Sequence, residues 1–121
     1  MHLREFERLV TEALEELPPA VQEMLDNVQV LAANFPTREQ LQENGGSRYE
    51  LLGLYEGVPL TERSSSYGMV LPDRITIFRG PLEAICKDRE AMAEQVRQTV
   101  KHELAHHFGI TDERLEEMGR Y

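Results

Sequence analysis

Three residues near the end of the sequence have the types and the spacing of a metal-dependent hydrolytic site. His102, Glu103 and His106 form the pattern H-E-x-x-H. On a helix the two histidines lie one turn apart on one face, so both imidazoles reach a single ion, and Glu103 projects beside them. Zinc accepts imidazole and carboxylate ligands, and a catalytic zinc keeps one position for water. The pattern therefore predicts one Zn2+ held by His102 and His106, with Glu103 as the general base toward a metal-activated water.

A third protein ligand is needed, and the expected residue is Asp112. The histidines outside the pattern are His2, at the far terminus, and His107. Gly109 can adopt a left-handed conformation that reverses the chain and returns Asp112 toward the metal. Asp112 would otherwise be the N-cap of a final short helix, a position that Thr111 also suits. Three competing carboxylates come later in the sequence: Glu113, Glu116 and Glu117.

His107 is expected to pack against neighbouring residues and not to bind metal. At 100° per residue it falls inside the apolar sector of the predicted helix, whereas His102 and His106 fall together outside that sector. The apolar sector consists of Met92, Val96, Val100, Leu104 and Phe108.

The elements that must position these residues are a long helix and a small sheet. The helical pattern runs from residue 87 to 108, and an amphipathic helix is predicted from Leu3 to Leu17, before two prolines. Shorter helices are expected after Pro18, after an N-cap at Thr37, and after Gly109. Strands are expected over residues 28–35, 51–58 and 74–79, with the last at a sheet edge because arginines flank it. This order predicts an α+β domain with a small mixed sheet of about three strands packed on helices.

Composition and charge exclude several classes of partner. A length of 121 residues suits one domain, 1–121, and the single cysteine excludes an intrachain disulfide. The formal net charge of -9, without clusters of Lys and Arg, argues against nucleic acid and anionic membrane surfaces. No apolar stretch approaches the roughly 18 residues of a membrane span, and no signal peptide is recognised. We therefore expect a cytoplasmic protein.

Residues 102–112, HELAHHFGITD, resemble the extended zincin motif H-E-x-x-H-x-x-G-x-x-[H/D]. The whole chain resembles the short bacterial minimal zincin-like metallopeptidases, whose strand pair is similar to LLGLYEGVPLTER and LPDRITIFRGPLE. The resemblance implies a zincin-like fold with His102, His106 and Asp112 as zinc ligands and Glu103 as general base. It also implies hydrolysis of peptide bonds in a peptide or protein substrate.

In zincins an edge strand pairs with the extended substrate. Here the resemblance implies that this strand consists of Arg74, Ile75, Thr76, Ile77, Phe78 and Arg79. Metzincins, a group of zincins, place a methionine below the zinc. Met118 either corresponds to that methionine or is a core residue. Tyr67 and Tyr121 are candidates for stabilising an oxyanion, and neither is favoured. The alternatives to a peptidase are a zinc-stabilised binding domain without turnover and a metal-free scaffold.

Overall fold

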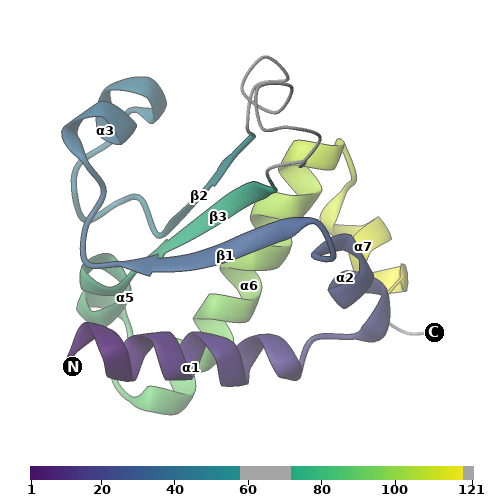
Figure 1. The fold of residues 1–121 in the computed structure, drawn as a ribbon, viewed down its shortest axis with the longest axis horizontal. Coiled ribbons are helices and arrows are strands. Elements are labelled where there is room, and N and C mark those ends of the chain that lie inside the picture. The colour runs from purple at the N-terminus through teal and green to yellow at the C-terminus, as the bar shows by residue number, and fades with distance from the viewer. Residues whose placement is uncertain (58–71, 119–121) are drawn as a thin grey trace, which may run out of the picture.

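The structure is a computed structural model that describes residues 1–57 and 72–118, apart from the side chains of Asp112 and Met118 (Figure 1). Helices and strands follow one another as α1 (Leu3–Glu15), α2 (Pro19–Met24), β1 (Val28–Ala33), α3 (Arg38–Asn44), β2 (Gly53–Glu56), β3 (Asp73–Phe78), α5 (Arg79–Ile85), α6 (Arg89–Phe108) and α7 (Asp112–Met118).

The three described strands form one mixed sheet in the order β1-β3-β2. β1 runs parallel to β3 and β2 runs antiparallel to it, so that Ile75 pairs with Val30 on one side and Tyr55 on the other. The α+β fold, with a small mixed sheet packed on helices and a long helix near the C-terminus, is confirmed.

The predicted edge position of residues 74–79 is wrong, because β3 is the central strand and has a hydrogen-bonded neighbour on both sides. Its last four residues are all buried, as expected for a strand covered on both faces. The flanking arginines misled the prediction, since they extend from the strand ends: Arg74 lies 3.7 Å from a carboxylate oxygen of Glu56, and Arg79 begins α5. The edge strand next to α6 is β2.

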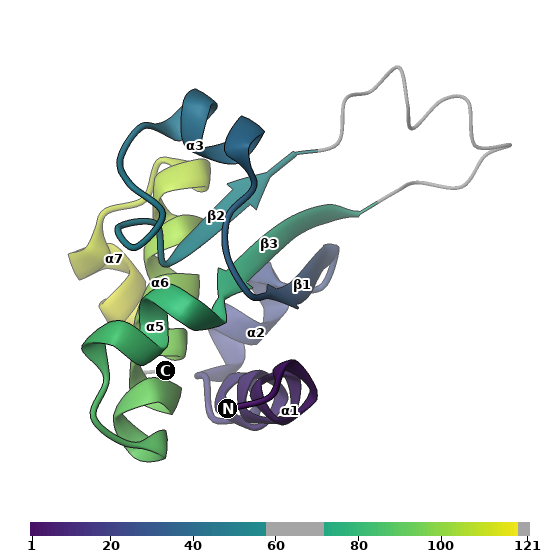
Figure 2. The same cartoon turned by 90° about the vertical axis from the view of Figure 1, so that its left-hand side faces the viewer.

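Two helices carry most of the core beneath the sheet. α1 contacts β1, α6 contacts β2 and β3, and the two helices pack on each other. α3 and α1 lie on opposite sides of the strands (Figures 1 and 2). The predicted apolar stripe of α1 is confirmed, with four residues buried inside the helix and Leu17 buried just after it. These four are Phe6, Leu9, Val10 and Ala13.

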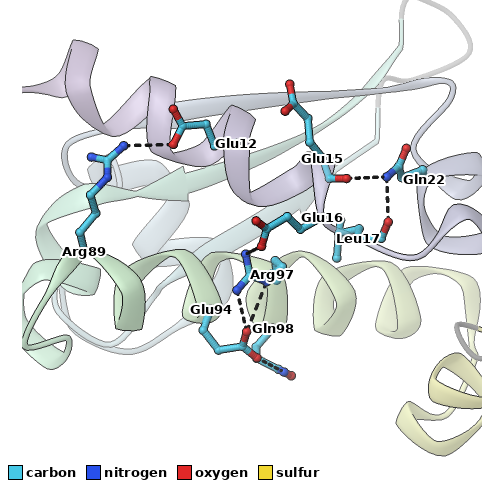
Figure 3. Close-up of polar contacts among 9 residues, drawn as sticks. All are labelled: Glu12, Glu15, Glu16, Leu17, Gln22, Arg89, Glu94, Arg97 and Gln98. Carbon is cyan, nitrogen blue, oxygen red and sulfur yellow. Dashed lines mark hydrogen bonds and ion pairs between the residues drawn. The ribbon is translucent and has the colours of Figure 1, made fainter.

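Polar contacts join α1 to α6 along the solvent side of this packing (Figure 3). Arg89 of α6 pairs with Glu12 of α1 at 3.2 Å, and Arg97 of α6 pairs with Glu16, the residue just after α1, at 3.0 Å. Arg97 also pairs with Glu94 on its own helix at 2.8 Å. The hydrogen bond from Gln98 and the contact with Arg97 hold the pKa of Glu94 below its ordinary value.

One helix was not expected from the sequence. α5 directly follows β3, where Gly80 and Pro81 had indicated only the end of a strand. The Gly80 N–H donates to the carbonyl of Asn34 at 2.8 Å, and a Cβ on Gly80 would lie 2.2 Å from the ring of Phe35. The glycine therefore allows the close approach, and a proline is tolerated in a first helical turn. No helix in the described part of the chain is long and apolar enough to span a bilayer.

Candidate active site

The last two turns of α6 carry the H-E-x-x-H residues. His102 and His106 are both exposed, and their ring centroids lie 6.4 Å apart with an angle of 27° between the planes. Asp88 caps the start of the helix, where its side chain accepts a hydrogen bond from the N–H of Ala91 at 2.8 Å. The continuous helix between the cap and these turns places both imidazoles on one face, as their spacing predicts.

Gly109 ends α6 and reverses the chain. Its φ of 67° and ψ of 29° are left-handed, and the N–H of Ile110 donates to the carbonyl of Ala105 at 2.8 Å. This is a Schellman arrangement, which glycine adopts without a steric penalty. The reversal returns α7 against α6, where Leu115 is only 3% exposed within the core. The predicted turn at Gly109 is confirmed.

Asp112 is the first residue of α7, and Thr111 caps that helix. The Thr111 hydroxyl accepts a hydrogen bond from the N–H of Arg114 at 3.1 Å. Of the two residues expected as possible N-caps, Thr111 and Asp112, it is therefore Thr111 that caps the helix. A hollow of about 300 Å3 separates this turn from the histidines and is lined by His102, Ala105, His106, Ile110 and Thr111. Asp112 directly follows Thr111 in the sequence.

Glu103 projects from α6 toward the outer edge of β2. Its Oε1 accepts a hydrogen bond of 2.9 Å from the backbone N–H of Tyr55. The N–H of Phe78 donates to the carbonyl of Leu52 at 3.0 Å. In an antiparallel pair, residues that are hydrogen-bonded to the partner strand alternate with residues that are not. The backbone N–H and C=O groups of Gly53 and Tyr55 therefore point away from β3. Glu103 thus lies where an edge strand and the H-E-x-x-H turn meet.

A groove of about 510 Å3 runs beside this edge and reaches both His102 and Glu103. Its walls come from the chain entering β2, from the solvent side of α6 and from α7. Apolar atoms of Leu51, Leu52 and Leu115 line it together with the carboxylates of Glu50 and Glu116. The remaining lining residues are Gly53, Gln95, Gln98, Thr99 and Lys101.

His107 makes the predicted packing contact, although on the surface and not in the core. Its ring stacks on Tyr55 with centroids 3.8 Å apart and planes inclined by 15°, and its side chain is 41% exposed. Phe108, expected in the apolar sector, is 49% exposed and packs edge-on against the rings of Tyr55 and His107.

Sequence reasoning did not identify Tyr55 as part of this region. No local pattern could have identified it, because its contact with Glu103 joins residues 48 apart in the sequence.

The donor set fits zinc in type. Among the side chains that the structure describes, no three His, Cys, Asp or Glu residues come together as a metal site. Two imidazoles on one helical face, with an aspartate in the sequence that follows the turn, are nevertheless the ligand types of a catalytic zinc site. The side chains of Asp112 and Met118 lie outside the described part of the chain, as do Tyr67 and Tyr121.

A mixed three-stranded sheet over a long helix with H-E-x-x-H beside its edge strand defines the class of zincin-like folds. Residues 25–120 match the family described as zincin-like metallopeptidase, so the chain belongs to that family. No curated protein sequence matches the chain significantly.

Proposed function

We propose that this protein is a zinc-dependent peptidase that hydrolyses peptide bonds at the H-E-x-x-H turn of α6. The observation that carries the proposal is the position of Glu103, whose carboxylate lies 2.9 Å from the backbone nitrogen of Tyr55 on the edge strand. A general base must be within hydrogen-bonding reach of the water that attacks the scissile carbonyl. At this position Glu103 is beside the strand edge along which we propose that an extended peptide lies.

His102, His106 and Asp112 would hold the zinc. Held there by two neutral imidazoles and one carboxylate, zinc would lower the pKa of water and polarise a neighbouring carbonyl. The Glu103 carboxylate takes one proton from the attacking water and passes it to the nitrogen of the leaving amine. Because Thr111 already caps α7, Asp112 is not required for that contact.

The substrate segment is proposed to lie along the outer edge of β2. Residues 74–79, the edge strand expected from the sequence, form the central strand β3. β-augmentation needs a sheet edge whose backbone groups point outward, and Gly53 provides such groups where it lines the groove. Leucine side chains on the groove walls favour an apolar substrate residue there. The nearby Glu50 and Glu116 carboxylates disfavour an acidic one.

Zinc content and cleavage of an unbiased peptide library test this function together. Protein purified without added zinc is expected to contain, or to bind on addition, one zinc per chain, and to cleave a subset of peptides. A stoichiometry near zero after zinc addition would overturn the proposal. Zinc binding with peptide binding but no cleavage would instead favour the zinc-stabilised binding domain.

A further inference from the structure

Tyr55, on the outer edge of β2, contacts α6 at two residues that are one helical turn apart. Its backbone N–H donates to Oε1 of Glu103 at 2.9 Å, and its ring stacks on His107 with centroids 3.8 Å apart. Glu103 and His107 directly follow His102 and His106 in the sequence. Residues spaced by four share a helical face, so the two contacts of Tyr55 and the two proposed ligands occupy adjacent faces of the same turn.

The phenol of Tyr55 is anchored to the neighbouring strand. Its hydroxyl donates to Oδ2 of Asp73, the first residue of β3, at 2.7 Å, and Nε2 of His107 lies 4.0 Å from the same oxygen. Tyr55 pairs with Ile75, whose side chain is in the core shared with α6, so Tyr55 and Asp73 lie on the helix-facing side of the sheet. Tyr55 is therefore held at its backbone, its ring and its hydroxyl.

We propose that Tyr55 is a positioning residue for the site: it fixes the rotation of the 102–107 turn relative to the sheet edge. With Glu103 and His107 held against Tyr55, His102 and His106 share the outward face and Glu103 faces the edge strand. The inference rests on the proposed function for its catalytic consequence. The contacts themselves involve none of the proposed zinc ligands, which allows the two to be tested separately.

The first experiment measures amide hydrogen exchange in metal-free protein. Tyr55→Leu removes the ring stack and the hydroxyl, and we expect the amides of residues 102–108 to exchange about fivefold faster, as loss of one aromatic pair implies. Tyr55→Phe keeps the ring and should change exchange less. Tyr49→Leu is the matched control, since Tyr49 is exposed and packs on Phe35. Exchange in this turn unchanged from wild type in Tyr55→Leu would overturn the proposal.

The second experiment separates positioning from general stability. In zinc-loaded protein, Tyr55→Leu should weaken zinc binding about tenfold in a chelator competition, the scale of an outer contact to a metal site. It should also alter the visible spectrum of the cobalt-substituted protein and lower kcat for a cleaved peptide while leaving KM unchanged. His107→Phe retains a ring that is able to stack on Tyr55, so its zinc affinity, cobalt spectrum and kcat should stay near those of the wild type. His107→Ala removes that ring and should change all three.

The outcomes distinguish the two proposals. Faster exchange with an unchanged cobalt spectrum and kcat would overturn positioning and leave Tyr55 a structural residue. Wild-type protein that binds no zinc would refute the peptidase proposal, and with it any positioning of a zinc site. If Tyr55→Leu does not fold, His107→Ala removes the same stack from the helix side and provides the same exchange readout.

Discussion

Gly53 of β2 lies directly against Thr99 of α6. A Cβ built on Gly53 would be 2.6 Å from Cγ2 of Thr99, 3.1 Å from Cδ1 of Ile77 and 3.2 Å from the carbonyl oxygen of Thr76. The edge strand and the helix therefore approach as closely as a residue without a side chain allows. This contact sets the distance between the strand edge and the turn that carries Glu103, four residues further along α6.

Gly53→Ala is expected to lower the free energy of unfolding by about 1–3 kcal/mol, because the added methyl overpacks a buried contact. Thr99→Ser removes the clashing Cγ2, so the double variant should recover part of that loss, while the contacts with Ile77 and Thr76 remain. Urea unfolding of the four proteins in a double-mutant cycle measures the coupling. Gly57→Ala is the control, since its nearest neighbour would be 3.7 Å away. If the effects of the two substitutions on the free energy of unfolding simply add, the contact between Gly53 and Thr99 does not limit how closely β2 approaches α6.

Asp112 and Thr111 are expected to have separable roles. Thr111→Ala removes the cap of α7 and should cost about 1 kcal/mol in the metal-free protein. Asp112→Asn should instead reduce zinc affinity by more than about tenfold with a smaller effect on metal-free stability. Chelator competition measures the affinity, with the exposed Glu113→Gln as control. If Glu113→Gln weakens zinc binding as much as Asp112→Asn, Asp112 is not the particular carboxylate that binds.

Glu103→Gln should keep the zinc and lose the hydrolysis. The amide preserves the size of the side chain and an acceptor for the Tyr55 N–H, but it cannot take a proton from water. Loss of a general base lowers kcat by about 10^2–10^4-fold, which peptide cleavage under saturating substrate measures. His2→Gln, at the opposite terminus, should change neither zinc content nor kcat. Full activity in Glu103→Gln would remove Glu103 from the mechanism.

Zinc affinity should fall with pH because a ligating imidazole must be neutral. Protons compete with the metal for the imidazole nitrogens, so the apparent dissociation constant should rise as the pH falls. Zinc titrations from pH 8 to pH 5 follow this competition. An affinity independent of pH over that range would contradict ligation by His102 and His106.

The elements with strong periodicity were predicted well from the sequence. The stripe of α1, the cap at Thr37 and the reversal at Gly109 depend on local chemistry, and each has the predicted partner in the structure. Strand order does not depend on local chemistry. The arginines near β3 indicated an edge, yet the sheet places β3 in the centre because β1 pairs with it in parallel from a distant part of the sequence.

The candidate site divides in the same way. The spacing of His102 and His106 alone predicts a shared helical face, since it depends on one helix. The position of Glu103 beside Tyr55 joins residues 48 apart in sequence, and it depends on which strand forms the edge. The sequence could therefore identify the turn that carries the chemistry but not the strand that it faces.

The Glu94 contacts predict a change of stability at acid pH. Bonds from Gln98 and Arg97 hold the folded-state pKa of Glu94 below its ordinary value of 4.5, so they stabilise the fold above that pH. The stabilisation is lost as the pH falls through the lowered folded-state value. Because the Glu94 side chain is 56% exposed, the effect should be below about 1 kcal/mol and should shrink with added salt. Urea unfolding of wild type and Glu94→Gln should therefore converge as the pH falls from 6 to 3, and a difference that grows toward acid would reverse the assigned sign.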